Sequence, residues 1–562
     1  MSKLIQRCRM AVAGLLLAAM PMVALHAQDA ESKPVAVVSV APLKKILGDV
    51  QYLADAAQQT DAGRMAAFMA APFTGGIDKA RPIAVVVMTN GQDFAPTAYL
   101  PVEDFDKLVA TGTEQIGPPT DVGEGVKMFT PGQMPVFVKQ IGQWAVVAMD
   151  QEKLANPLAD PTALLMTLPA DYDLALKVFP GNIPELYRTV FIEQLKTGIE
   201  LSLQQEPDET DEEFAARKEQ LNNQLADIDR IFTELEDITV GWNVDATQQG
   251  TYFDIAYTAG EGSEFAKSLA LNSDLATEFA GFTNPASAFS FQVTEKLTDA
   301  DMQRVGKQMN DLRDQAVRQL VADGELDGED LESAKKVIDL AIDTLIETAK
   351  TGRIDGVMSV DLADGKGVFL AAAHVADGQR VEDGFKELVK LAAEDGLPPV
   401  EWNAGTHQTV RLHVLKVPMD DAPPEAKKIL GDSPEVVLGV GEKSVYIVGG
   451  YDAMARIKKG IDDSMAATDA KSSIFAMHLA ALPILKMTKE NSPRPMPGVD
   501  EAIEALSGGN DKFIVSGDIT DRVVRIRIMM QEGLIKAIGA GVAAANAAGP
   551  AGGDFEDDAP AF

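Results

Sequence analysis

The chain has 562 residues, enough for two to four ordinary domains; 46% of them are hydrophobic and 24% are charged. This composition is typical of a globular protein and excludes a disordered or fibrous one. The formal net charge of -35 repels phosphate backbones, so nucleic acid is not an expected partner.

The first 27 residues have the order of a secretory signal peptide. Lys3, Arg7 and Arg9 precede an apolar run from Ala11 to Leu25, and the small residue Ala27 follows it. The run is too short for a stable membrane span, so we expect cleavage after residue 27. The sequence therefore predicts an exported protein, periplasmic or extracellular, with no membrane span after cleavage.

The single cysteine, Cys8, lies before this apolar run. A lipid anchor needs a cysteine just after such a run, so we expect none. The mature chain is then free of cysteine, which excludes disulfides, thiolate metal sites and a cysteine nucleophile.

Residues 28–270 contain two long units and one small unit. The first long unit begins with a strand and helix over 34–56 and continues with a hairpin and a further helix. A small hairpin follows over 134–155, and the second long unit begins at Asp173 and ends near residue 270.

The same order returns over residues 286–540, after a linker over 271–285. We interpret this as a tandem duplication of two α+β halves, each an antiparallel sheet with covering helices. Four strand pairs should then be equivalent: Val35–Val40 with Ser287–Val293, Trp144–Met149 with Val445–Gly449, Asp173–Phe179 with Ser473–His478, and Tyr252–Tyr257 with Val368–His374.

Two helical hairpins are predicted as insertions, near Phe191–Leu235 and Met302–Ala349, at non-equivalent places in the halves. Thr298 precedes Asp299 and Asp301 and is expected to cap the second insertion. Each hairpin is either an arm that grips a partner or a pair that caps the sheet; apolar stripes favour the cap. Residues 541–562 are expected to form a disordered acidic tail.

A weak calcium candidate lies between the helices of the second insertion. Asp323, Glu325 and Asp327 occupy the first half of a loop that resembles a calcium loop. Its twelfth position is Ala334, where a bidentate carboxylate is needed, so the strongest ligand is missing. No other metal or cofactor site is predicted.

Motifs for catalysis are absent or incomplete. The Gly431–Pro434 stretch GDSP is followed by no Asp-x-x-His, which the triad of a lipase-like hydrolase family needs, and no Gly-x-Ser-x-Gly elbow occurs. The histidines at 374, 407, 413 and 478 all lie in predicted strands. We place His407 and His413 on one strand, too far apart for a shared metal. No catalytic residue is therefore assigned.

Trp402 is the one ligand candidate. It lies in the stretch PPVEWNAGTHQ, which we interpret as a loop, whereas Trp144 and Trp242 alternate within predicted strands and are expected to be buried. An exposed tryptophan on a loop suits stacking against a ligand.

The signal peptide, the acidic cysteine-free mature chain and the repeated strand–helix–hairpin units resemble the large uncharacterised exported proteins common in planctomycete-type bacteria. The resemblance covers the whole chain, has no diagnostic motif and implies no activity.

Three hypotheses on function follow. The first is a secreted or periplasmic non-catalytic protein that binds a protein or small-molecule partner, or has a structural role. The second is an extracytoplasmic hydrolase with a carboxylate-based site between the halves, which needs perturbed carboxylates beside a pocket. The third is a carrier of an amphipathic ligand, which needs a large apolar cavity.

Overall fold

The computed structural model describes residues 32–202 and 233–547, apart from 325, 327, 364, 395–396, 420–421, 468–470 and 493–495, and also residues 205, 214, 217 and 218. The fold is α+β, as predicted. The predicted signal peptide, residues 1–27, lies outside the described residues, and so does most of the first predicted helical insertion.

Ten strands come from the first half of the chain. They are β1 (Lys33–Val40), β2 (Ile83–Thr89), β3 (Phe94–Pro101), β4 (Thr120–Asp121), β5 (Val126–Phe129), β6 (Val136–Ile141), β7 (Trp144–Ala148), β8 (Leu174–Val178), β9 (Leu235–Asp245) and β10 (Gly250–Ala259).

Ten more strands come from the second half. They are β11 (Phe289–Lys296), β12 (Arg353–Ala363), β13 (Lys366–His374), β14 (Glu401–His407), β15 (Val410–Lys416), β16 (Glu435–Val440), β17 (Ser444–Gly450), β18 (Phe475–Ala480), β19 (Lys512–Thr520) and β20 (Val523–Gln531).

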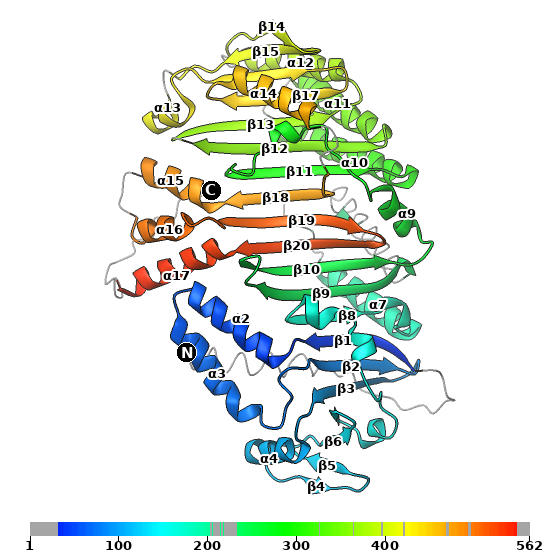
Figure 1. Cartoon of the computed structure of the whole chain (residues 1–562). Coiled ribbons are helices and arrows are strands. Elements are labelled where there is room, and N and C mark those ends of the chain that lie inside the picture. Colours follow the sequence, from blue (N-terminus) through cyan, green and yellow to red (C-terminus); the bar gives the residue numbers. More distant parts are fainter. Residues whose placement is uncertain are drawn as a thin grey trace.

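All these strands form one antiparallel sheet (Figure 1). The pairings run in the order β14, β15, β16, β17, β13, β12, β11, β18, β19, β20, β10, β9, β8, β1, β2, β3, β7, β6, β5, β4. The sequence predicted two separate sheets; the structure joins them because β10 pairs with β20 along nine residues, from Gly250 opposite Gln531 to Thr258 opposite Val523.

The two halves have the same strand order, counted outward from the β10–β20 seam. Each strand of the first half corresponds in position to the strand numbered ten higher, which is the order that a duplication predicts. Three of the four predicted equivalences follow this rule: β1 with β11, β7 with β17 and β8 with β18. The fourth is wrong, because β10 corresponds to β20, and β13 corresponds to β3.

Every long unit carries a pair of helices or a long helix between its first two strands. These are α2 (Leu43–Ala56) with α3 (Thr60–Ala70), α7 (Glu185–Ser202), α10 (Asp299–Asp323) with α11 (Gly328–Lys350), and α15 (Ala481–Asn491) with α16 (Val499–Leu506). Helix pairs are thus not confined to the two predicted insertions; the other two are shorter. Thr298 caps α10 in a capping box with Asp301, as expected.

The other helices follow hairpins. They are α4 (Phe105–Ile116), α5 (Thr162–Leu165), α6 (Leu168–Asp171), α9 (Glu264–Leu271), α12 (Gly378–Glu394), α13 (Pro424–Leu430), α14 (Ala453–Ala466) and α17 (Glu532–Ala547). Helix α17 includes the first residues of the predicted tail, so the expectation of disorder from residue 541 is wrong for 541–547; the rest lies outside the described residues.

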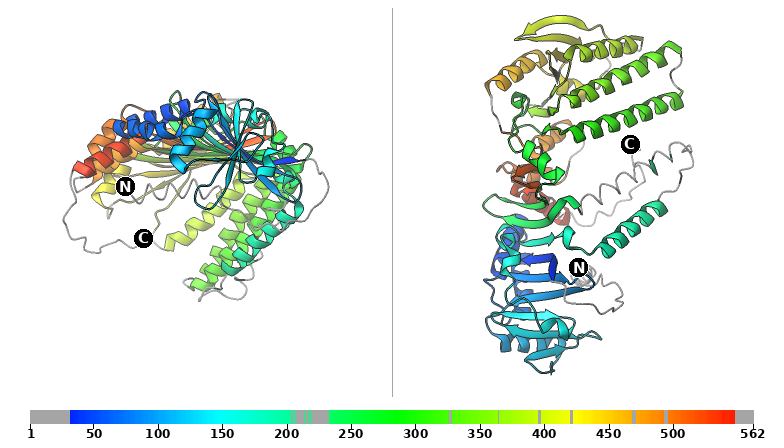
Figure 2. Two further views of the ribbon diagram at one scale, coloured as in Figure 1. Left: turned by 90° about the horizontal axis from the view of Figure 1, so that it is seen from below. Right: turned by 90° about the vertical axis from the view of Figure 1, so that its right-hand side faces the viewer.

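The long helices extend away from the sheet. Figure 2 shows α10, α11 and α7 projecting on one side, whereas α2, α3 and α17 lie on the other. No described residue of α10 is buried, and the buried residues of α11 belong to its C-terminal part, from Ile342 to Ala349. The second helical hairpin therefore packs at its base and protrudes at its tip.

The two faces of the sheet are covered differently. We call the face that carries Tyr252 and Asp254 the closed face, and the face that carries Phe253 and Ile255 the open face. Two large apolar clusters lie on the closed face, one in each half. The predicted linker 271–285 belongs to the second cluster, because Phe279 and Phe282 are almost fully buried there.

The open face is covered at its two ends. In the first half α4 packs there, with Phe105 and Leu108 against Phe129 and Val138. In the second half α12 packs over β15 and β16, where its residue Glu382 meets Arg411. Between these ends the strands of the open face keep partly exposed side chains.

Candidate functional site

A cluster of charged and phenolic side chains lies on the closed face at the seam between the halves. Asp254 of β10 stands opposite Arg527 of β20, and their side chains form two hydrogen bonds of 2.8 Å. Arg525 lies 3.7 Å from the same carboxylate, and the Tyr172 hydroxyl donates to it at 3.0 Å. Asp254 is 0% exposed. We call these four residues and Tyr252 the junction cluster.

Tyr252 holds the arginine in place. The Arg527 guanidinium lies 3.7 Å from the centre of the Tyr252 ring, in a cation–π contact. The Tyr252 hydroxyl donates to the Asp171 carbonyl at 3.1 Å and accepts from the Asn243 amide at 3.1 Å. Each polar group of the cluster is therefore satisfied from a different strand or turn.

A second ion group continues the junction cluster toward α2. The Asn243 side-chain oxygen accepts from the Lys45 ammonium at 2.9 Å, and Lys45 also contacts Asp49 and Asp173. Asp173 accepts in addition from the Val244 backbone N–H at 2.9 Å. Polar contacts thus run from β20 of the second half to α2 of the first.

The surroundings of Arg527 and Tyr172 in the junction cluster favour their protonated forms. The hydrogen bonds from Arg527 to Asp254 raise the pKa of the Arg527 guanidinium. Burial and the nearby Asp254 charge raise the pKa of the Tyr172 hydroxyl. Both groups therefore hold their protons more firmly than usual. A buried carboxylate held bidentately by arginine is a structural clamp, and breaking one costs several kcal/mol.

Trp402 lies in the edge strand β14, not on a loop, so that prediction is wrong. Its ring packs edge-on against the rings of Phe385 and His413, with 5.9 Å and 5.1 Å between the ring centres. The Lys386 ammonium lies 5.4 Å from the centre of the Trp402 ring. These neighbours occupy the ring, which is half-buried. The role of Trp402 in ligand binding stays a prediction.

Beneath Trp402, Glu382 of α12 is the centre of a second ion cluster. It accepts from Lys386 at 2.7 Å and from Arg411 at 2.6 and 3.1 Å. Burial alone would raise the pKa of Glu382, but the bonds from Lys386 and Arg411 lower it to about 2. Burial lowers the pKa of His413, whose Nε2 faces Glu382 at 3.5 Å. This cluster fastens α12 to the open face.

The histidines lie in strands, as predicted, but His407 and His413 belong to neighbouring strands β14 and β15 rather than to one strand. A turn at Gln408, with φ of 53°, separates them. Within the described ranges, no three His, Cys, Asp or Glu side chains are grouped as a metal site. Glu325 and Asp327 of the calcium candidate lie outside the described residues, as does the Asp323 side chain.

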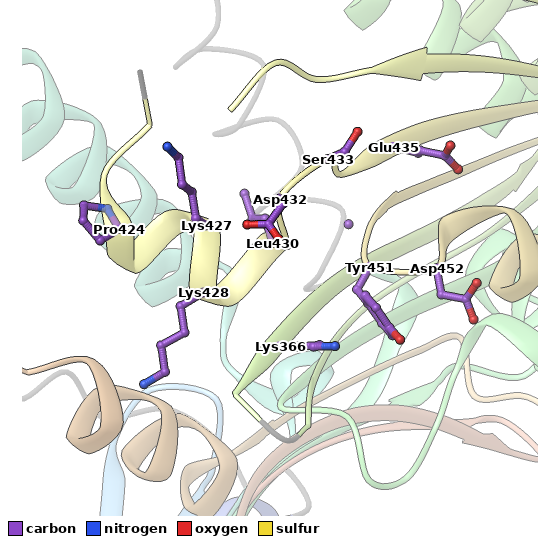
Figure 3. Close-up of a pocket in the computed structure, with 12 residues that line it drawn as sticks. Lys366, Pro424, Lys427, Lys428, Leu430, Asp432, Ser433, Glu435, Tyr451 and Asp452 are labelled. Carbon is purple, nitrogen blue, oxygen red and sulfur yellow. The ribbon is translucent and has the colours of Figure 1, made fainter. Parts of the chain in front are cut away.

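An open depression of about 730 Å³ lies at the ends of β13, β16 and β17 (Figure 3). Lys366, Lys427 and Lys428 line it together with Asp432, Glu435 and Asp452, so its charges balance. The Lys366 ammonium lies 3.6 Å from the centre of the Tyr451 ring, and Lys428 donates to the Glu490 carbonyl at 3.0 Å. This depression is remote from the junction cluster and contributes no cleft to it.

A row of apolar side chains crosses the open face in register. Along the pairings, one residue of each of ten strands stands beside the next: Leu174, Trp242, Phe253, Ile528, Val515, Met477, Phe291, Met358, Ala371 and Ile447. We call this set the apolar row. Leu174, Phe253 and Ile447 are exposed and the others are half-buried.

Sequence reasoning found neither the junction cluster nor the apolar row. The alternation in β20 contained a signal, because Arg525 and Arg527 alternate with Ile526 and Ile528. The usual reading turns the isoleucines to the core and the arginines to solvent. The structure does the opposite, since Asp254 on the paired strand offers the arginines a buried partner.

No protein-family model, curated protein or solved structure is significantly similar to this chain. Among the described residues, no helix is both long and apolar enough to cross a membrane.

Proposed function

We propose that the chain is an exported, non-catalytic binding protein, and that the apolar row holds an apolar surface of a partner protein. The observation that carries this proposal is the row itself: apolar side chains in register on ten strands, none fully covered by the described helices. Exposed apolar patches of this extent are uncommon on monomers and mark interaction sites.

The dimensions of the row favour a macromolecule over a small ligand. Ten strands spaced about 4.8 Å apart span about 43 Å. The neighbouring positions Ile255 and Ile526, paired with each other across β10 and β20, widen the row on one side. A carrier of an amphipathic ligand would instead enclose its ligand in an apolar cavity.

The charge distribution favours an uncharged partner surface. The apolar row contains no ionisable side chain, although the chain as a whole has a net charge of -35. Charges beside the row lie on the opposite face, where Asp254 and Arg527 neutralise each other. The same pair disfavours the carboxylate-based hydrolase, because the Asp254 carboxylate is fully buried and bonded to Arg527.

Site-specific photo-crosslinking in the native host tests the proposal. A benzophenone amino acid replaces Phe253 or Leu174 on the row, and Leu186 on α7, which is 70% exposed, serves as control. We expect the same protein adduct from both row positions and none from Leu186. Adducts of lipid only, of a second copy of this chain, or none at all would overturn a distinct protein partner.

Export is tested separately. The basic, apolar and small-residue order of the N-terminus supports removal of residues 1–27. Protein recovered from outside the cytoplasm of the native host should begin at Gln28. An intact Met1 terminus on cytoplasmic protein would contradict export without affecting the apolar row.

A further inference from the structure

A second exposed apolar surface lies far from the apolar row, on α3 and the turn that follows it (η1, Ala71–Phe73). Met65, Phe68, Met69 and Phe73 are 61%, 80%, 53% and 58% exposed. Their spacing of three, four and eight residues from Met65 places them on one side of a helix. We call these four residues the α3 stripe.

The α3 stripe points away from the body of the protein. The opposite side of α3 packs on α2, where Gly63 is buried and an added Cβ would lie only 3.1 Å from Ala54. Helix α2 in turn lies over the closed face, because its Lys45 contacts Asn243. Figure 1 accordingly shows α3 at the outer edge of the molecule, with α2 between it and the strands.

The stretch between Asp61 and Asp78 lacks acidic residues. Residues 62–77 contain one charged side chain, Arg64, whereas the whole chain has 85 Asp and Glu among 562 residues. Asp61, whose side chain is 95% exposed, lies one helical turn before Met65 and is paired with Arg64. The stripe is therefore an apolar surface with no net charge beside it, on a strongly acidic protein.

We propose that the α3 stripe docks on the surface of a lipid bilayer. Four side chains are too few for a stable protein interface, which needs roughly 800 Å² per partner. Phenylalanine and methionine on one side of a short helix suit insertion to the depth of the headgroups. The exposed guanidinium of Arg64, beside the stripe, lies 3.5 Å from the exposed Asp61 carboxylate, and a lipid phosphate competes for this weak pair.

The net charge gives this docking an unusual salt dependence. Anionic lipid attracts most peripheral proteins, and salt weakens their binding. Here the remainder of the chain, at -35, is repelled by anionic lipid. We therefore expect tighter binding to phosphatidylcholine than to mixtures with phosphatidylglycerol, and salt should strengthen binding to the mixtures.

The test uses the full-length chain with Cys8→Ser and one new cysteine, Phe68→Cys, labelled with an environment-sensitive fluorophore. Phosphatidylcholine vesicles should raise its fluorescence, and a label at Leu186→Cys on α7 should not respond. The double variant Phe68→Ser/Met69→Ser should weaken vesicle co-sedimentation about tenfold. Leu186→Ser, equally exposed, should change it by less than about twofold.

The variants also separate the stripe from the apolar N-terminal run, which could bind vesicles by itself. Only the difference between variants counts, because residues 11–25 are the same in all of them. Equal co-sedimentation of the double variant and the unchanged chain would overturn the proposal. A silent label at position 68, or a dimer that dissociates on Phe68→Ser/Met69→Ser without any vesicle binding, would also overturn it.

Discussion

The two faces of the central strands reverse the usual distribution of polar and apolar residues. One residue along from the apolar row, the closed face has its own row in register: Ala175, Gly241, Asp254, Arg527, Ser516, Ala476, Gln292, Val357, Ala372 and Tyr446. Small and polar residues dominate the covered side, and large apolar ones dominate the side that helices leave open.

The reversal shows what each face is built to do. Small side chains and a buried ion pair let the chain pack closely on the closed face, where the two large apolar clusters lie. Large half-exposed side chains on the open face leave apolar area in contact with water, which is unfavourable by about 25 cal/mol per Å². A partner that removes this area from water would relieve that cost.

The largest expected effect concerns the ion pair of the closed face. Arg527→Ala leaves the Asp254 carboxylate buried without its bidentate partner, so the free energy of unfolding should fall by about 3 to 5 kcal/mol. Urea unfolding followed by tryptophan fluorescence measures it.

The control for Arg527→Ala is Lys267→Ala, which breaks the exposed pair with Glu264. It should cost less than about 1 kcal/mol. A loss below about 1 kcal/mol for Arg527→Ala as well would mean that the ion pair does not hold the closed face together.

The next effect concerns the place where α12 covers the open face. The pKa of Glu382 is about 2 in the folded chain, below its ordinary 4.5, so its stabilisation is present above pH 4.5 and lost as the pH falls toward 2. The loss amounts to about 3 kcal/mol. Burial also lowers the pKa of His413, so its neutral form stabilises the fold. This stabilisation, too, is lost as the pH falls below the ordinary pKa of 6.5.

Urea unfolding at a series of pH values measures this dependence. In Glu382→Gln the decline between pH 4.5 and 2 should be shallower by the same amount. An unchanged slope in that variant would assign the acid sensitivity to other carboxylates.

A smaller difference in the free energy of unfolding is expected between substitutions on the two faces of one strand. Val448 of β17 is 0% exposed on the closed face, and its neighbour Ile447 is 40% exposed on the open face. Val448→Ala should lower the free energy of unfolding by about 2 kcal/mol, and Ile447→Ala by less than about 1 kcal/mol, although it removes more atoms. Equal losses would show that the open face is as well packed as the closed one.

The smallest expected effect is on metal removal. No metal-site grouping occurs in the described part of the chain, so EDTA should shift the Tm by less than about 1 °C. A decrease of several degrees would direct attention to the turn between α10 and α11, where Asp323 ends α10.

Local pattern predicted the elements well and their long-range pairing less well. Alternation located β1, β7 and β8 and their counterparts, because one face of each strand is regularly apolar. It could not show that β10 pairs with β20, since nothing local distinguishes a strand at a seam from one at an edge. The equivalence of β10 with β13 failed for that reason.

The site predictions failed where local chemistry misled. Around Trp402, proline, asparagine and glycine indicated a loop, but β14 includes Asn403 with φ of 55° and an irregular register between Glu401 and Gly405. A strand of this kind has too little alternation to be recognised. The alternation of arginine and isoleucine in β20 does not reveal by itself that Asp254 lies opposite Arg527.

The position of β20 has a consequence for how the chain acquires its structure. Asp254 and Arg527 are 273 residues apart, and β20 is inserted between β19 and β10. During synthesis or passage across a membrane β10 arrives early and must wait, with an unpaired edge, for the last strand of the chain. A chain that stops before Val523 would leave one edge of β10 and one edge of β19 without a partner strand, and such edges recruit other chains. Loss of a few dozen C-terminal residues should therefore make the product more prone to aggregate.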